Sequence, residues 1–378
     1  MKLSIIILNY NVSYFLKQCI ISVQRAIGNL DAEIIVIDNA SVDDSCAMVQ
    51  RDFPNIHLIE NKENVGFSKA NNQAVAVAKG EYLCILNPDT AVAEDTFLKC
   101  FNKVVTLPTL GVLGVYLLDG TGNFLPESKR NLPKPKASLL KLLGFTKKYY
   151  ATTISEENEG EVAVLVGAFM FLKRSVYAQV NGFDEDYFMY GEDIDLSYKI
   201  TQAGYQNYYL GSTETLHYKG ESTQKDAAYL QRFYGAMQIF YKKHFKTTIF
   251  LDVTVKVGVA LAKLLKTKNI SKNRKKIADP SQAIVVTDNF SLLKELSAVI
   301  EKPLKSVSKS VFQDGSVYNT LVIFDASYIP YTQIFQVMRQ YKNMGNQFRI
   351  RPPGCNFLVG SDQSDNKGGV VLFGELVN

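Results

Sequence analysis

The chain has 378 residues, which is long enough for two or more domains that each bury a core. Its 47% hydrophobic and 21% charged residues are ordinary for a soluble globular protein, and its formal net charge is a mild +5. The five cysteines are scattered, odd in number and without CxxC spacing. This pattern argues against a disulfide framework or a zinc site and favours a reducing compartment.

The first residues, "MKLSIIILNYN", become polar too early for a signal peptide. No uninterrupted apolar run reaches about 18 residues, the length that a membrane-spanning helix needs. We therefore expect a cytoplasmic protein.

The first 90 residues alternate between short apolar runs and helical patterns. Strands are predicted over 3–8, 33–38, 56–61 and 82–89, with helices between them, one starting near Ser41 and one over 67–79. This order predicts an α/β fold with an open, doubly wound, mostly parallel sheet. Each strand ends in polar residues, namely Asn9-Tyr10-Asn11, Asp38-Asn39, Glu60-Asn61 and Asn87-Pro88-Asp89. Because ligands bind outside the carboxyl ends of such strands, we expect the site at this edge.

The rest of the chain divides into three parts. A strand is predicted over 162–174 and a helix from Glu192 to Gly204, which is well placed as the residue that ends a helix. Helical patterns follow from Tyr229 to Phe245 and over 249–265, and a small α/β unit begins near residue 280. We therefore expect a main domain over 1–222, a helical extension and basic linker over 223–279, and an accessory domain of unknown role over 280–378.

Three short motifs in the first half carry candidate ligand contacts. In "VIDNASVDDS" Ser41 is a candidate helix N-cap, and Asp38 either builds the turn or accepts hydrogen bonds from a ligand. "ENVGFSKANNQA" places Gly66 at a tight turn before a helix, among amide side chains that suit a sugar or a phosphate. In "LNPDT" Pro88 directs Asp89 away from the sheet, as a turn residue or as an oxygen ligand for a divalent cation.

These motifs, with "SIIILNYN" before them and "GAFMFLKR", "GFDEDYFMYGEDIDLSYKITQAGY" and "LHYKGES" after them, resemble family 2 glycosyltransferases of the GT-A fold. "NPD" and "GFDEDYFMYGEDIDL" are most similar to the rhamnosyltransferase-type branch. The resemblance covers residues 3 to about 245. It implies an inverting enzyme that moves a sugar from dTDP-rhamnose or a UDP-sugar to a saccharide or lipid-linked saccharide, in the synthesis of bacterial surface polysaccharides.

The resemblance also implies roles for individual residues. Asp38 matches the acid that contacts the nucleotide base, and Asn71 stands where many relatives have arginine. Asp89 matches the last acid of the Asp-x-Asp motif, whose first acid is replaced by Asn87, and His217 matches a histidine that completes the site for Mg²⁺ or Mn²⁺. The nucleotide-sugar-binding residues implied in this way are Asn9, Tyr10, Asn11, Asp38, Asn64, Gly66, Asn71, Asn72 and Asn87.

Three acids lie in the first turn of the helix predicted from Glu192. The helix dipole alone accounts for acids at this position, but their spacing allows only one or two to face the same pocket. The resemblance assigns Asp193 as the general base and leaves Glu192 to orient the acceptor or the start of the helix. We expect Asp195 to be a partner of the dipole, Asp184 to lie in a turn, and the acids at 185–186 to face solvent.

Other interpretations stay open from the sequence. The domain could bind nucleotide sugars without catalysis, or act as a nucleotidyltransferase, although "NYNVSYF" offers no Gly-rich basic loop after the first strand. The basic block at 263–276 is either a solvated linker or a patch for anionic lipid, and the helix at 249–265 either a connector or a peripheral membrane contact. No nucleic-acid partner is indicated, because the block is short and lacks interleaved aromatic residues.

Overall fold

The computed structural model describes residues 1–133, 146–221, 227–245, 279–313, 315, 317–364 and 367–374, with the side chains of 227–231 and 234 left out. The helix expected over 249–265 and the basic block at 263–276 lie outside these residues.

The first sheet contains nine strands of the described chain, in the order β3-β2-β1-β4-β8-β6-β9-β5, with β7 paired to β9. The strands are β1 Leu3–Asn9, β2 Ala32–Asp38, β3 His57–Glu60, β4 Tyr82–Leu86, β5 Thr90–Val92, β6 Leu110–Leu118, β7 Glu159–Glu161, β8 Phe169–Lys173 and β9 Gln206–His217. The helices around them are α1 Ser13–Ile27, α2 Ser45–Asp52, α3 Phe67–Val77, α4 Thr96–Val104, η1 Pro126–Ser128, α6 Arg174–Gln179, α7 Glu192–Gln202 and α8 Ala227–His244.

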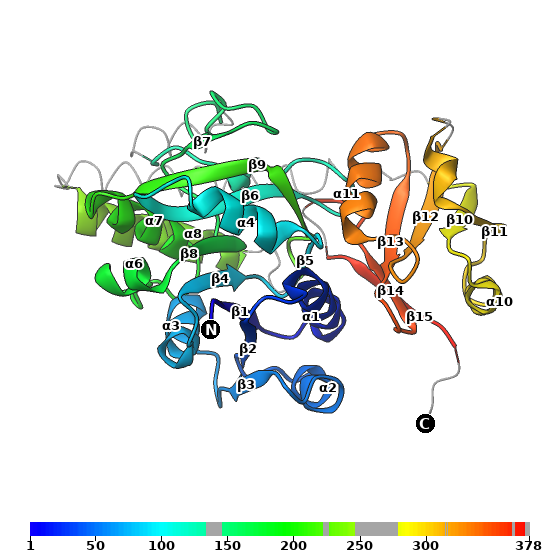
Figure 1. Ribbon diagram of the computed structural model, residues 1–378, viewed down its shortest axis with the longest axis horizontal. Helices are drawn as coiled ribbons and strands as arrows, with labels where there is room; N and C mark the ends of the chain where they lie inside the picture. The colour runs from blue at the N-terminus through cyan, green and yellow to red at the C-terminus, as the bar shows by residue number, and fades with distance from the viewer. Residues whose placement is uncertain are drawn as a thin grey trace.

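Helices cover both faces of this sheet (Figure 1). Successive side chains of a strand point to opposite faces, so Ile5 and Ile7 pack in one buried cluster and Ile6 in another. The first cluster includes side chains of α1, α2 and α4, and the second includes side chains of α3, α6 and α7. The apolar runs that predicted strands are therefore buried on both faces, as expected for a parallel sheet between helices.

The predicted α/β class is confirmed, with a mixed second half of the sheet. Strands β1 to β4 are parallel, but β8 runs antiparallel to both β4 and β6, and β5 and β7 run antiparallel to β9. The strand expected over 162–174 is shorter, because only Phe169–Lys173 joins the ladder. The helix expected near Ser41 begins at Ser45, since the Ser41 hydroxyl accepts a hydrogen bond from the Asn11 N–H instead of capping a helix.

The second sheet contains six described strands in the order β11-β10-β12-β13-β14-β15, and β11 to β13 are parallel. Its elements are β10 Gln282–Val286, α10 Phe290–Ser297, β11 Leu304–Val307, η2 Lys309–Phe312, β12 Thr320–Asp325, α11 Tyr331–Gln340, β13 Gln347–Arg351, β14 Phe357–Gly360 and β15 Gly369–Leu372. This unit lies beside the first sheet, at the right of Figure 1, and forms the small α/β unit expected after residue 280.

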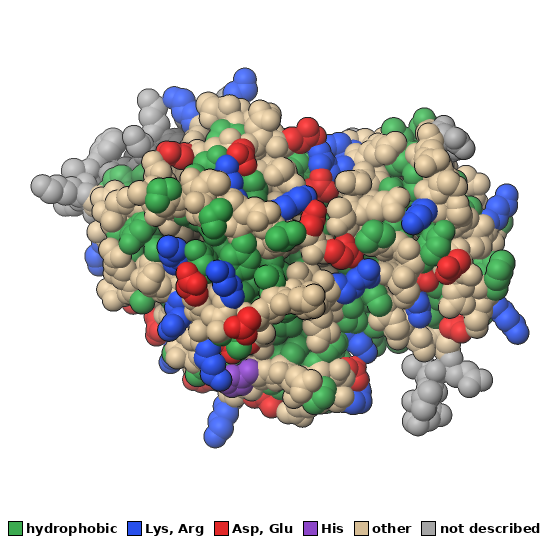
Figure 2. Space-filling model, viewed as in Figure 1, with side chains coloured by type: hydrophobic (Ala, Val, Ile, Leu, Met, Phe, Trp, Pro, Cys, Tyr) green, Lys and Arg blue, Asp and Glu red, His purple; other side chains and the backbone are tan. Residues whose placement is uncertain are grey.

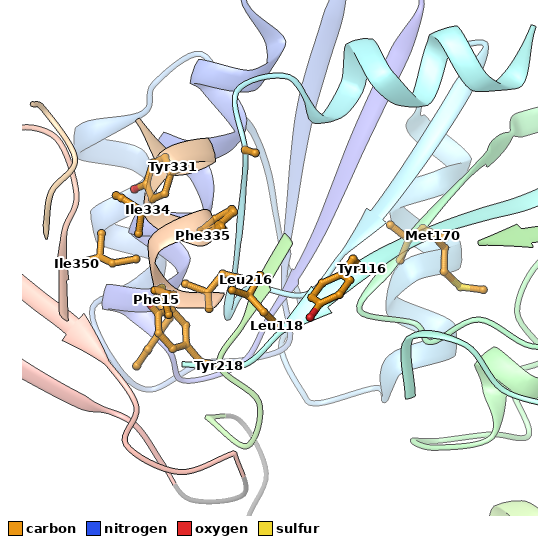
Figure 3. Close-up of a cluster of buried hydrophobic side chains, with 14 of the residues drawn as sticks. Phe15, Tyr116, Leu118, Met170, Leu216, Tyr218, Tyr331, Ile334, Phe335 and Ile350 are labelled. Carbon is orange, nitrogen blue, oxygen red and sulfur yellow. The ribbon is translucent and has the colours of Figure 1, made fainter. Parts of the chain in front are cut away.

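The two sheets share one apolar cluster. Tyr331 and Phe335 of α11 lie near Phe15 of α1 and Leu216 of β9, as Figure 3 shows. Polar contacts surround this cluster: Arg339 of α11 is paired with Glu157 and Glu214. The second unit is therefore packed against the first one through a continuous core.

Within the described residues, no helix is long and apolar enough to cross a membrane. On the face drawn in Figure 2, acidic and basic side chains are interspersed among the coloured residues. All five cysteines are free thiols.

Candidate active site

A pocket of about 410 Å³ opens at the carboxyl ends of the first sheet. The ends of β1, β2, β4 and β9 and the start of α7 contribute to it. Its polar and aromatic lining is made of Tyr10, Asn39, Asn64, Phe67, Asn87, Asp89, Glu127, Arg130, Tyr149, Tyr150, Tyr190, Glu192, Asp193, His217, Lys219 and Phe233. The structure thus brings together the two acids expected to do chemistry and the two residues expected to hold a metal.

Asp89 and His217 form a buried pair in this pocket. The antiparallel pairing of β5 with β9 sets Thr90 opposite His217, which brings Asp89 Oδ1 to 3.4 Å from His217 Nε2. The Asn87 amide nitrogen lies 3.5 Å from the same ring nitrogen. The side chains of Asp89 and His217 are almost inaccessible to solvent. A carboxylate oxygen and an imidazole nitrogen aimed at one point suit a divalent cation.

The described residues contain no group of three or more His, Cys, Asp or Glu side chains that could hold a metal. The part of the chain that the structure describes therefore offers Asp89 and His217 as ligands here, which fits Mg²⁺ or Mn²⁺ if substrate oxygens and water complete the shell. The charges of the pocket point the same way. Lys219 is paired with Glu127, and Arg130 with Asp193, so both of these cations are already balanced by carboxylates. Burial raises the pKa of Glu127, but the Lys219 ammonium outweighs it and holds that pKa below its usual value.

The acids at the start of α7 are positioned by an unusual turn. Tyr190 and Gly191 both have positive φ, 72° and 81°, so the chain reverses sharply before the helix begins at Glu192. Asp193 Oδ2 accepts hydrogen bonds from the Arg130 guanidinium at 2.5 Å and from the Gly167 N–H at 3.2 Å. Asp193 Oδ1 accepts the N–H of Ile194 at 2.8 Å. The carboxylate is held by three donors from three parts of the chain.

Glu192 has a different environment from its neighbour. Its side chain is buried, and Oε2 has no hydrogen-bond partner among the described residues. Burial, followed by the charge of Asp193, raises the pKa of Glu192 to about 8. A buried carboxyl oxygen without a partner in a ligand pocket marks a place where a bound molecule can supply the missing hydrogen bond.

Asp195 faces away from the pocket, as the helical spacing predicted for at least one of the three acids. Its side chain is fully buried, where it meets His244 of α8 at 2.6 Å and Lys199 of α7 at 3.3 Å. It is an internal ion-pair partner that ties α8 to α7, and not only a partner of the helix dipole. Asp184 does lie in a turn, where it accepts the Asp186 N–H, and both acids pair with Lys243.

The polar residues at the ends of β1 and β2 form a network beneath the pocket. Asn9 is fully buried and donates to Asp38 Oδ2 at 2.7 Å, while Asp38 Oδ1 accepts the Ser41 N–H. Asn11, at φ 55°, accepts the Val42 N–H. Of Asn9, Tyr10 and Asn11, only Tyr10 lines the pocket itself. Asp38 does not line it, but the next residue, Asn39, does.

The asparagines around α3 fall into two groups. Asn64 lines the pocket and accepts the Gly66 N–H, whereas Gly66 lies against the Phe188 carbonyl. Asn71 and Asn72 do not line the pocket: Asn71 is fully buried and donates to the Phe67 carbonyl, four residues earlier in α3. Asn72 clamps the loop after α6 by donating to the Phe183 carbonyl. Asn71 and Asn72 were expected to contact the nucleotide sugar. In the structure their amide groups instead donate hydrogen bonds to backbone carbonyls of the protein.

Arg130, Glu127, Tyr149 and Lys219 are pocket residues that the sequence analysis did not identify. Three of them lie in the stretch 119–160, which has no strand or helix periodicity and lacks a recognisable motif. Lys219 lies in the motif "LHYKGES", two residues after His217. Its closeness to His217 is the sequence feature that could have indicated it as a pocket residue.

Comparison with known proteins identifies the enzyme class of the chain. Residues 4–180 match the family model described as Glycosyl transferase family 2. The chain therefore carries a family 2 glycosyltransferase domain, and its enzyme class is that of the glycosyltransferases.

Among the relatives are rhamnosyltransferases. An N-acetylglucosaminyl-diphospho-decaprenol L-rhamnosyltransferase of Mycobacterium tuberculosis is 28% identical over 225 residues, which cover 55% of this chain and 73% of the relative. Rhamnosyltransferase WbbL of Escherichia coli is 30% identical over 164 residues, or 40% of this chain and 61% of the relative. The domain is thus rhamnosyltransferase-like in sequence.

Among solved structures, a mannosyltransferase of Pyrobaculum calidifontis in complex with GDP-Man and Mn²⁺ aligns with a TM-score of 0.47 at 19% identity. The alignment covers 71% of this chain and 74% of that one.

Proposed function

We propose that the pocket transfers a sugar from a nucleotide-diphosphate sugar to a hydroxyl of a saccharide or lipid-linked saccharide, with inversion at the anomeric carbon. The observation that carries the proposal is that Asp89 and His217 line the same pocket as Glu192 and Asp193. Such a site joins a place for a cation with a carboxylate that can take a proton. These are the two requirements of sugar transfer from a diphosphate.

The donor diphosphate needs positive charge that the protein alone does not supply. Arg130 and Lys219 are both paired with carboxylates, and Asp89 adds a negative charge to the pocket. Asp89 and His217 would hold Mg²⁺ or Mn²⁺, with Asn87 beside them. When bound, the cation neutralises charge on the departing diphosphate. The polar ends of β1 and β2, with Tyr10, Asn39 and Asn64, would receive the nucleoside.

The transfer itself follows from the carboxylate at Asp193. The acceptor oxygen forms a bond to the anomeric carbon while the bond from that carbon to the diphosphate oxygen breaks, and the electron pair of that bond leaves with the nucleoside diphosphate. The hydroxyl proton passes to Asp193. If the base lies on the face opposite the leaving group, the configuration inverts.

The rhamnosyltransferase-like sequence favours dTDP-rhamnose or a UDP-sugar as donor and a polysaccharide of the cell surface as product. The Mycobacterium relative is named for a decaprenol-diphosphate-linked acceptor, and a further relative is a Poly(ribitol-phosphate) beta-glucosyltransferase of Bacillus spizizenii. We propose a lipid-linked saccharide as the acceptor, with the enzyme working at the inner face of the cell membrane.

The test is a thermal-shift panel of nucleotide sugars with and without Mn²⁺, followed by transfer assays with the donor that stabilises the protein most. One donor should raise the melting temperature in the presence of the metal and be turned over with a lipid-linked or free saccharide. Donor binding without any transfer to a broad acceptor set would instead support a binding module without catalysis.

A further inference from the structure

The two adjacent acids at the start of α7 differ in their contacts, although both line the pocket. Asp193 accepts hydrogen bonds from Arg130, Gly167 and Ile194, whereas Glu192 Oε2 has no partner in the described part of the chain. A buried carboxylate with a cation and several donors around it is stabilised in its ionised form. A buried carboxyl without such partners is stabilised in its neutral form.

The Arg130 side chain is buried and is directed at Asp193. Its backbone forms a bridge with Val164, with the Arg130 N–H 2.9 Å from the Val164 oxygen, which fixes the start of the side chain. The guanidinium donates to the Leu165 carbonyl at 3.0 Å and to Asp193 at 2.5 Å. The residue is buried, and the charge of Asp193 more than offsets burial and raises the pKa of Arg130. The cation is therefore permanent and stays beside one acid of the pair.

We propose, on the basis of the proposed function, that Arg130 divides the acidic pair. Asp193 is kept ionised to take the acceptor proton, and Glu192 carries a proton with which it donates a hydrogen bond to an oxygen of a bound sugar. Arg130 is a positioning residue that acts through Asp193. The proton of Glu192 stays on Glu192 during transfer, so only the acceptor hydroxyl changes its protonation state together with Asp193.

The charged groups around Glu192 support this division. Asp193 and Asp195, on the same helix, disfavour a negative charge on Glu192, whereas its own backbone N–H and Arg130 favour it. Asp195 is itself held by His244 and Lys199, and Arg130 is engaged by Asp193. Because two carboxylates share one buried cation, ionising both would leave a net negative charge in a pocket that must receive a diphosphate.

The isosteric amides separate the two roles. Asp193→Asn removes the base and should lower kcat by about 10²–10⁴-fold. Glu192→Gln keeps a neutral hydrogen-bond donor and should lower kcat by less than about tenfold, whereas Glu192→Ala should cost clearly more. The wild-type rate should also fall as pH rises through about 8, when Glu192 loses its proton, and this alkaline limb should disappear in Glu192→Gln.

Arg130 is tested by the acid limb of the same profile. Arg130→Gln leaves Asp193 buried without its cation, so the acid limb of the pH–rate profile should move to higher pH. In Arg130→Lys the limb should return most of the way to its wild-type position. A variant that merely loosened the fold would lower the rate at every pH without moving the limb.

The protonation state can be measured without turnover, by infrared difference spectroscopy of the full chain at pH 7. We expect a protonated-carboxyl C=O band in the wild type that is absent in Glu192→Gln and retained in Glu63→Gln, a variant of an exposed acid. If the band were unaffected by Glu192→Gln, or if Glu192→Gln lost as much activity as Asp193→Asn, the division would be wrong. Donor binding and wild-type transfer are scored separately, so a failed proposed function shows as a wild type that does not transfer, with the infrared result still readable.

Discussion

The molecule contains two mixed α/β sheets, and an acid follows or ends a parallel strand in each of them. In the first sheet, Asp89 follows β4 and faces the pocket with His217. In the second sheet, the comparably placed Asp325 ends β12, but its oxygens accept hydrogen bonds from Thr287, Ser327 and Arg351. One acid thus lines a pocket, where we propose a ligand role for it, whereas the other is part of an internal network.

The second sheet is also closed by the first domain. Arg25 of α1 donates to the Ala326 carbonyl, just after β12. The N-terminus of α11, where an anionic ligand could bind, is occupied by Glu94, which accepts the N–H groups of Tyr331 and Thr332. These polar groups at the carboxyl end of the second sheet are therefore satisfied within the protein.

The largest effect is expected for Asp89→Asn. It removes the carboxylate that we propose as the cation ligand next to His217, so transfer should fall about a thousandfold, since a bound metal contributes several kcal/mol to charge neutralisation. Nucleotide affinity should also lose its dependence on Mn²⁺. Steady-state assays and calorimetric titration with and without the metal would measure both effects, and unchanged transfer would contradict the comparison.

The matched control in the second sheet is Asp325→Asn. Arg351 is mostly buried and would lose its charged partner, so the free energy of unfolding should fall by about 3 kcal/mol. The kcat of the folded protein should stay at the wild-type value. Denaturant unfolding and steady-state kinetics measure the two quantities, and a large loss of kcat in the folded variant would give the second sheet a catalytic role.

Gly66→Ala tests how the loop that lines the pocket of the first sheet is positioned. Gly66 has φ 87°, and an added Cβ would lie 2.6 Å from the Phe188 oxygen and 2.8 Å from its ring. The loop that carries Met189 and Tyr190 into the pocket must then move, with a cost of about 1–3 kcal/mol in stability and a higher KM for the acceptor. The control is Gly204→Ala. Gly204 has φ 90°, and an added Cβ would have no atom within 4 Å, so this variant should show backbone strain without the change in KM.

The smallest effect is expected at the cover of the second sheet. Glu94→Gln should lower the free energy of unfolding by about 1 kcal/mol, because it removes the anion at the start of α11. Asp95→Asn, in an exposed pair with Lys99, should change it by less than about 0.5 kcal/mol. Thermal unfolding measures the difference between the two variants, and equal shifts would contradict the capping role.

The pH dependence of that contact has a defined sign. Burial raises the pKa of Glu94, but the N–H groups of Thr332 and Tyr331 outweigh it and hold the pKa below the usual 4.5. A lowered pKa in the folded state means that the stabilisation is present above about pH 4.5 and is lost as the pH falls through the folded-state pKa. The difference in the free energy of unfolding between wild type and Glu94→Gln should therefore become smaller at acidic pH.

The sequence predicted the parallel strands β1, β2 and β4 because each consists mainly of an apolar run, and it predicted the more polar β3 from "IHLIEN". It did not predict β9, whose residues "NYYLGSTETLH" mix polar and aromatic side chains without strict alternation. It identified Asp89, His217, Glu192 and Asp193 through short motifs. Arg130 could not be found in this way, because its pairing with Asp193 spans 63 residues and depends on the bridge to Val164.

Anomalous scattering from Mn²⁺ in crystals grown with UDP or dTDP tests the central claim most directly. The account predicts one manganese peak in contact with Asp89 and His217, with the diphosphate completing its coordination and the peak absent from Asp89→Asn. A peak elsewhere in the molecule, or nucleotide bound away from the carboxyl ends of β1 to β4, would contradict it.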